Sequence, residues 1–128
     1  MKRVVVILAL LSATGPALAE GADATTRHEI SYLLGYLGSS SCRFNRNGTW
    51  HGAGRAVAHL NRKYEYLLRK DLVRTAEEFI QRAASQSSTS GKPYTVKCGN
   101  GPEVPSGEWF GDALRRYREG APRSRVRQ

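Results

Sequence analysis

Apolar residues recur at helical spacing in four stretches of the chain, and each stretch predicts an amphipathic helix. The clearest lies at Thr26–Leu37, where isoleucine and leucine follow the i, i+3, i+4, i+7 spacing of one buried helix face. The others are Gly52–Arg69, Thr75–Ser85 and Gly107–Arg118. Thr26 with Glu29, and Thr75 with Glu78, have the spacing of an N-terminal capping box. The pattern predicts a mainly helical domain with about four helices.

One further segment, Tyr94–Lys97, alternates between apolar and polar residues and predicts a short β-strand. It can form a two-stranded ribbon with Arg43–Arg46, which lies in the connector Ser39–Thr49. Asn47-Gly48 in that connector predicts a turn, because both residues tolerate positive φ. Asn100–Pro105 is rich in turn residues as well. The expected fold is mainly α, a small single domain with one short strand or two-stranded ribbon.

The N-terminal residues Met1–Ala19 have the three parts of a secretory signal peptide. Two basic residues follow the initiator methionine, Val4–Leu11 is an unbroken apolar run, and the last three residues, Ala-Leu-Ala, form a small-x-small cleavage site. We expect cleavage after Ala19 and a mature protein that is periplasmic or secreted. No other apolar run approaches the roughly 20 residues that a membrane span needs, so we expect no transmembrane span after cleavage.

Cleavage would leave residues 20–128, which are 109 residues and the size of one modest domain. The helical pattern ends near residue 119. We therefore expect the helical domain at residues 20–119. The last segment, residues 120–128, contains Pro122 and three arginines, and it predicts a flexible basic tail.

Cys42 and Cys98 are the two cysteines of the chain. An even number of cysteines in an exported protein predicts a disulfide, which would staple the loop after the first helix to the predicted strand. Two isolated cysteines lack the usual zinc ligand set, so we expect no metal site and no cofactor. A catalytic thiol is the less favoured alternative.

The chain is strongly basic, with a formal net charge of +9. Without the signal peptide, 18 basic and 11 acidic residues leave +7. In a cytoplasmic protein this charge would favour nucleic acid, but export separates the chain from it, so we expect no nucleic-acid partner. An unknown protein or an anionic envelope component, such as a lipid headgroup, is the expected partner of a monomer. A solvated basic surface without a dedicated partner is the plainer alternative.

Five motifs follow one another along most of the chain. They are Phe44-x-Arg46-Asn47-Gly48, Ala56-x-x-His59-Leu60-x-x-Lys63, Thr75-Ala76-Glu77-Glu78-Phe79-Ile80, Ala84-Ser85-x-Ser87-Ser88-x-Ser90-Gly91-Lys92-Pro93-Tyr94 and Ser106-x-x-Trp109. In this order they resemble the YfeK-like family of small exported bacterial proteins of unknown function. The resemblance implies an exported helical domain and brings no reaction and no catalytic residue. Arg55 stands where that family usually carries an acidic residue.

The loop before the predicted strand is the best candidate surface for function. It combines hydroxyls, a cation and a flexible glycine, supplied by Ser88, Ser90, Gly91, Lys92 and Tyr94. A serine near a lysine can act as a nucleophile with its base. A small hydrolase or an enzyme inhibitor acting through Ser90–Tyr94 is therefore one possible function. A structural turn that closes the preceding helix is the plainer interpretation.

A second candidate site lies on the second helix. His59 and Lys63 share one helix face at i, i+4 spacing, and Arg46 lies near the start of that helix, so the three could form an anion site. A packed or solvated histidine is the alternative. Because no catalytic motif is recognisable, we expect a non-catalytic binding or envelope-associated protein rather than an enzyme.

Overall fold

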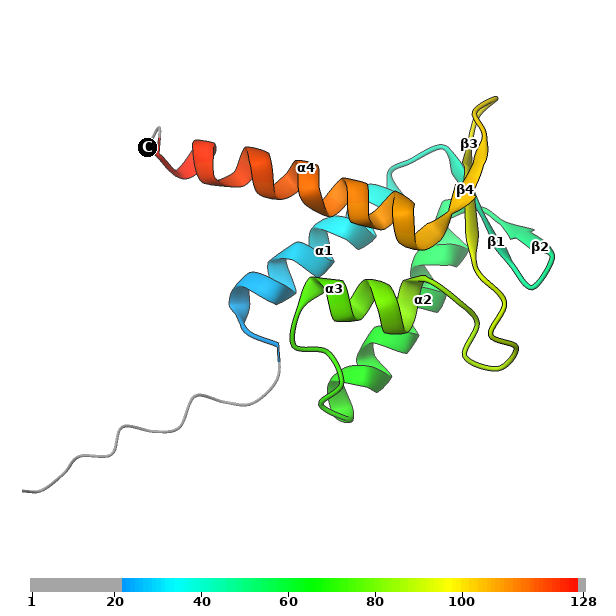
Figure 1. Cartoon of the computed structure of the whole chain (residues 1–128), viewed down its shortest axis with the longest axis horizontal. Coiled ribbons are helices and arrows are strands. Elements are labelled where there is room, and N and C mark those ends of the chain that lie inside the picture. The colour runs from blue at the N-terminus through cyan, green and yellow to red at the C-terminus, as the bar shows by residue number, and fades with distance from the viewer. Residues whose placement is uncertain (1–21, 127–128) are drawn as a thin grey trace, which may run out of the picture.

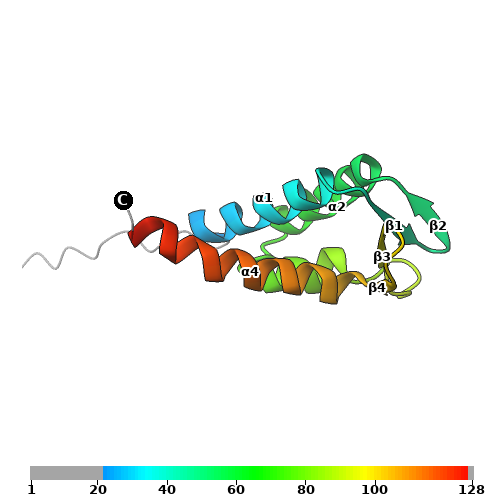
Figure 2. The same ribbon diagram turned by 90° about the horizontal axis from the view of Figure 1, so that it is seen from above.

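The structure, a computed structural model, describes residues 22–126, and its helices lie in two layers with a small sheet at one end (Figures 1 and 2). One layer holds α1 (Ala24–Gly38) and α2 (Ala53–Arg69). The other holds α4 (Ser106–Val126) and α3 (Ala76–Phe79), which continues directly as the π-helical segment η1 (Ile80–Ala84). The four predicted helices are present.

The sheet has four antiparallel strands in the order β2-β1-β3-β4. These are β1 (Cys42–Arg46), β2 (Thr49–His51), β3 (Thr95–Cys98) and β4 (Glu103–Pro105). The expectation of a mainly helical fold with one short ribbon is therefore wrong in its finer part, because the fold mixes helices with a four-stranded sheet. The predicted ribbon of β1 and β3 is present, and β2 and β4 pair with its two outer edges.

Local capping explains where the helices begin. Asp23 Oδ1 accepts a hydrogen bond from Thr26 N at 2.8 Å and caps α1, so this helix begins before the predicted Thr26. The Thr26 hydroxyl instead donates to the Arg74 carbonyl at 3.0 Å, which ties α1 to the start of α3. Thr75 does cap α3, since its hydroxyl accepts from Glu78 N at 3.1 Å. One of the two predicted capping positions is thus confirmed.

The core lies between the two helix layers and the inner face of the sheet. All four helices and both central strands, β1 and β3, contribute large side chains to this core, as does Tyr94, which directly precedes β3. The large fully buried side chains include Ile30, Leu33, Leu37, Phe44, Leu60, Phe79, Tyr94, Val96 and Phe110. The disulfide between Cys42 and Cys98 joins directly paired positions of β1 and β3, as the cysteine count predicted.

The C-terminal end of the chain differs from the prediction, and the predicted signal peptide lies outside the described residues. α4 continues to Val126, eight residues beyond the predicted end at Arg118, so helix occupies most of the segment that we expected to be a tail. The predicted signal peptide, Met1–Ala19, lies outside the described residues. Within residues 22–126, no helix combines the length and the apolar character that a membrane crossing requires.

Candidate functional site

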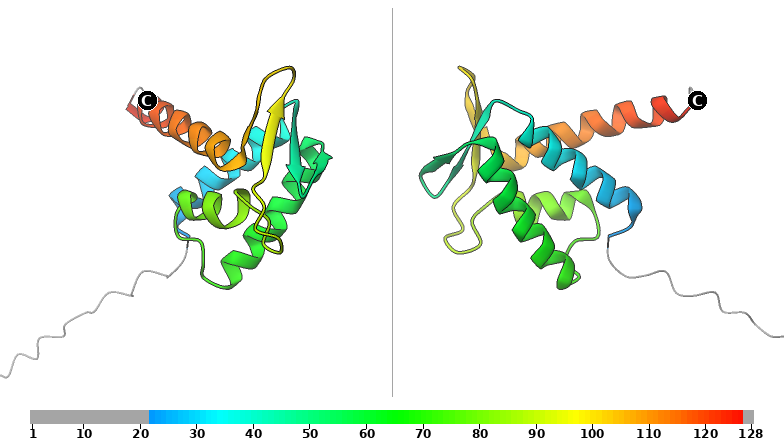
Figure 3. Two further views of the ribbon diagram at one scale, coloured as in Figure 1. Left: turned by 45° about the vertical axis from the view of Figure 1, so that its right-hand side comes forward. Right: turned by 180° about the vertical axis from the view of Figure 1, so that it is seen from behind.

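Four side chains from three parts of the fold meet beside α2, and we call them the basic cluster: Arg46, His59, Lys63 and Tyr94. Arg46 is the last residue of β1, His59 and Lys63 lie one turn apart on α2, and Tyr94 precedes β3. The loop that connects η1 to β3 passes beside α2 (Figure 3), and Lys63 Nζ of α2 donates to the Gln86 carbonyl of this loop. Of the two sites expected from the sequence, the loop therefore contributes Tyr94 to the predicted anion site.

Hydrogen bonds connect the basic cluster into a chain. Arg46 Nη1 lies 2.8 Å from His59 Nδ1, and His59 Nε2 lies 3.1 Å from the Tyr94 hydroxyl. Lys63 Nζ donates to the same hydroxyl at 3.2 Å and to the carbonyl of Gln86 at 3.0 Å. Lys63 Nζ also lies 5.0 Å from the centre of the Tyr94 ring, within cation–π range.

The donors fix the tautomer of His59. A guanidinium can only donate, so His59 Nδ1 must accept the bond from Arg46 and the imidazole proton must be on Nε2. His59 Nε2 then donates to the Tyr94 oxygen, which also accepts from Lys63. Because the Tyr94 oxygen accepts from both His59 and Lys63, the Tyr94 hydroxyl does not use its own proton in either bond. The cluster thus presents donors only.

Within the part of the chain that the structure describes, no carboxylate balances the positive charges of the basic cluster. None of the ion pairs among the described residues includes Arg46 or Lys63. Burial, followed by the charge of Arg46 and then of Lys63, lowers the pKa of His59 to about 4. Burial, followed by Arg46, lowers the pKa of Lys63 to about 8. Burial also raises the pKa of the Tyr94 hydroxyl. The protein therefore holds cations here in a setting that disfavours them.

The loop between η1 and β3 is ordered by hydrogen bonds to the β1–β2 turn. Ser90 Oγ donates to Asn47 Oδ1 at 2.6 Å, and Asn47 Nδ2 donates to Ser87 Oγ at 3.3 Å. The buried Ser87 hydroxyl in turn accepts from Ser90 N at 3.3 Å, and Gly91 turns the chain with φ of 71°. The hydroxyls of this loop therefore hold it to the sheet, in agreement with the structural alternative.

The remaining candidate residues of the loop take no part in the cluster. Ser88 and Lys92 are exposed, and Lys92 lies at the closing turn, where its carbonyl accepts from Ser87 N at 2.9 Å. Sequence reasoning missed the role of Asn47, which it interpreted as a turn residue only, and of Ser87, which organises the loop. The Phe44 motif, which contains both Arg46 and Asn47, was the available signal.

A cavity of about 480 Å³ adjoins the basic cluster, and we call it the α2 pocket. Its lining comes from α2, from the end of η1 and from the loop: His59, Arg62, Lys63, Tyr66, Leu67, Arg82 and Ser88. His59 and Lys63 thus belong to both the cluster and the pocket. No pattern in the sequence pointed to Arg62, Tyr66 and Arg82, because the pocket forms only when η1 packs against α2.

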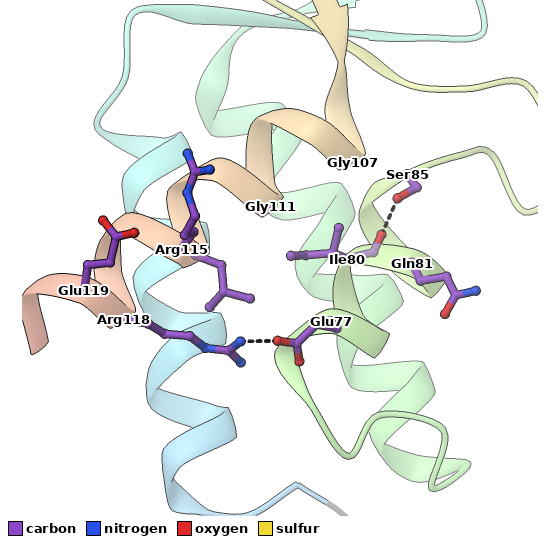
Figure 4. Close-up of a pocket in the computed structure, with 10 residues that line it drawn as sticks. Glu77, Ile80, Gln81, Ser85, Gly107, Gly111, Arg115, Arg118 and Glu119 are labelled. Atoms are coloured by element: carbon purple, nitrogen blue, oxygen red, sulfur yellow. Dashed lines mark hydrogen bonds and ion pairs between the residues drawn. The ribbon is translucent and has the colours of Figure 1, made fainter. Parts of the chain in front are cut away.

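A larger cavity, of about 630 Å³, lies between η1 and α4 (Figure 4). Ile80 and Leu114 line it, and Gly107 and Gly111 open it along α4. Its charge is already paired, because Arg118 forms ion pairs with both Glu29 and Glu77, which raise its pKa. The unpaired basic cluster is therefore the better candidate for a charged ligand.

Fold and site together define a class: a small disulfide-bonded domain of four helices and a four-stranded antiparallel sheet that carries an unpaired basic cluster. The chain belongs to the Family of unknown function (DUF5329), whose model matches residues 24–118. It is 38% identical over 95 residues to the Uncharacterized protein YfeK of Salmonella typhimurium, which covers 73% of this chain and 77% of that protein. No solved structure matches. The resemblance to the YfeK-like family is confirmed, and the matched region contains the whole basic cluster.

Proposed function

We propose that this protein is an exported, non-catalytic binding protein that holds an anion at the basic cluster. The observation that carries the proposal is the meeting of Arg46, His59 and Lys63 around one buried tyrosine, with no carboxylate from residues 22–126 paired to them. Arg46 and Lys63 are half-buried, and charges that are partly withdrawn from water gain from an opposite partner. A bound anion would supply the missing negative charge and would raise the pKa of Lys63 toward its ordinary value.

The geometry of the donors supports the same proposal. Arg46 offers its remaining guanidinium hydrogens and Lys63 offers a third ammonium hydrogen, while the buried Tyr94 hydroxyl holds His59 and Lys63 in place. Charge-assisted bonds from arginine and lysine are the strongest hydrogen bonds to phosphate and carboxylate oxygens. Because these donors are held by bonds to one another, little side-chain freedom remains to be lost when an anion binds.

Export is part of the proposal and has two supports. The N-terminal pattern is that of a signal peptide, and the Cys42–Cys98 disulfide is of the kind that persists in oxidising compartments. The mature protein would begin at Glu20. The alternative function, a hydrolase acting through Ser90, is less well supported, because the Ser90 proton is donated to the Asn47 amide oxygen rather than to a base.

Titration with inorganic phosphate tests the anion site. We expect phosphate to raise the melting temperature of the protein more than chloride does at equal ionic strength, since a ligand that binds only the folded state stabilises it. Lys63→Met should remove most of this phosphate-specific rise, because it deletes a donor but keeps the side-chain length. Lys97→Met is the matched control, since Lys97 lies on β3 away from the cluster and its loss changes the net charge equally.

Two results would contradict the proposal. One is the absence of any phosphate-specific rise in the wild-type protein. The other is an equal loss in the Lys63→Met and Lys97→Met variants, which would mean that phosphate responds to overall charge and not to the basic cluster.

A further inference from the structure

The α2 pocket is apolar over much of its lining although basic side chains surround it. Tyr66, which is 52% exposed, and the buried Leu67 supply its apolar surface. The aliphatic stems of Arg62, Lys63 and Arg82 can add to that surface while their charged ends stay in water. Small-molecule pockets are commonly lined by aromatic and aliphatic side chains of this kind, with a few polar groups that orient the ligand.

The charges around the α2 pocket are all of one sign. Arg62, Lys63 and Arg82 line it, and Arg46 reaches it through His59. No ion pair among the described residues involves any of these four cations. A ligand that fits must therefore carry negative charge at the end that meets the basic cluster and apolar surface at the end that meets Tyr66.

We propose that the α2 pocket binds a small phosphate monoester whose ester group is an apolar ring or a short alkyl chain. This inference rests on the proposed anion site and adds the chemical class of the ligand. A phosphate monoester is close to a dianion at neutral pH. It suits several converging cations better than a carboxylate does, and guanidinium groups match its oxygens with paired hydrogen bonds.

The size of the cavity favours an organic ester over inorganic phosphate. A volume of about 480 Å³ lies within the range of small-molecule pockets. An inorganic phosphate at the basic cluster would leave Tyr66 in contact with water, whereas an apolar ester group would cover it. An open cavity of this volume has room for one small molecule, so we favour a soluble ester over a phospholipid that stays in its membrane.

The experiment compares two ligands by isothermal titration calorimetry: inorganic phosphate and phenyl phosphate, each with the wild-type protein. We expect phenyl phosphate to bind at least tenfold more tightly. Tyr66→Ala should remove most of this preference and leave the affinity for inorganic phosphate unchanged, because Tyr66 contacts only the ester group. Tyr32→Ala is the matched control, since Tyr32 is a partly exposed tyrosine on α1 and should keep the full preference.

The outcomes separate this inference from the proposed function. Equal affinities for the two ligands would overturn the inference and leave the anion site standing, while binding of neither ligand would overturn both. Retention of the preference in Tyr66→Ala would also overturn the inference. So would tighter binding to vesicles of anionic phospholipid than to phenyl phosphate, because the ligand would then be a membrane surface.

Discussion

At the scale of single residues, His59 is the most constrained group of the site. It must stay neutral, because protonated Nδ1 would bring a second donor against the guanidinium of Arg46. Its pKa is lowered to about 4 from an ordinary value of 6.5. The unfolded chain therefore takes up a proton before the folded protein does as the pH falls. The contribution of His59 to stability is present above pH 6.5, declines between pH 6.5 and 4, and is fully lost below pH 4.

The substitution His59→Gln tests this proton linkage, because the glutamine amide can still accept from Arg46 and donate to Tyr94 but cannot titrate. We expect the free energy of unfolding of the wild-type protein to fall by about 1 kcal/mol more than that of the variant between pH 7 and pH 4. This figure is discounted for the partial exposure of the imidazole. Urea unfolding at several pH values measures it, and parallel pH profiles for both proteins would contradict the low pKa.

At the scale of elements, the contact between η1 and α4 depends on a missing side chain. A Cβ atom on Gly107 would lie 2.8 Å from Ser85 Oγ, which is too close for contact. Ser85 cannot move freely, because its hydroxyl donates to the Ile80 carbonyl at 2.7 Å and so satisfies a carbonyl of the π-helical segment. An alanine at residue 107 would therefore have to displace the Ser85 hydroxyl from the Ile80 carbonyl.

The substitution Gly107→Ala should lower the free energy of unfolding by about 1 kcal/mol, because the displaced Ser85 hydroxyl loses its hydrogen bond. In a Ser85→Ala background the same substitution should cost much less, which a double-mutant cycle measures. Gly111→Ala is the control on the same helix. Its Cβ would meet no atom within 4 Å, so it should stabilise α4 by about 0.5–1 kcal/mol through helix propensity. Additive effects of the Gly107 and Ser85 changes would contradict the close contact.

The elements also show how far the sequence predicts this fold. The helices follow from periodic apolar residues, and the turn at Asn47-Gly48 is confirmed, with φ of 52° and 85°. The edge strands β2 and β4 were missed because each has three residues and forms only through pairing with its neighbour. The convergence of His59 and Lys63 could be read from helical spacing. The approach of Tyr94 could not, since it joins residues 35 apart in the chain.

At the scale of the whole molecule, the disulfide connects the two central strands of the sheet. Cys42 and Cys98 are 56 residues apart in sequence, and both α2 and the loop that ends at Tyr94 lie between them. In the chain-entropy model, a covalent loop of this length constrains the unfolded state by roughly 4 kcal/mol. That is a large part of the stability of an ordinary domain of this size.

Replacing both cysteines by alanine should therefore lower the free energy of unfolding by about 2–4 kcal/mol in urea titrations. The control is the oxidised wild-type protein. Mass spectrometry without reductant verifies its disulfide, because the oxidised chain has lost two hydrogens and is about 2 Da lighter than the reduced chain. Equal free energies of unfolding for the double variant and the wild-type protein would contradict a stabilising role of the disulfide. A mature mass that shows two free thiols would contradict the bond itself.

The position of the disulfide has a consequence for when binding becomes possible. Arg46, His59, Lys63 and Tyr94 all lie inside the covalent ring that Cys42 and Cys98 close, whereas α1 and α4 lie outside it. While the thiols are reduced, the ring is open, and only non-covalent contacts hold the basic cluster together. On the proposed export route, oxidation would close the ring around the proposed anion site at the same step that stabilises the fold.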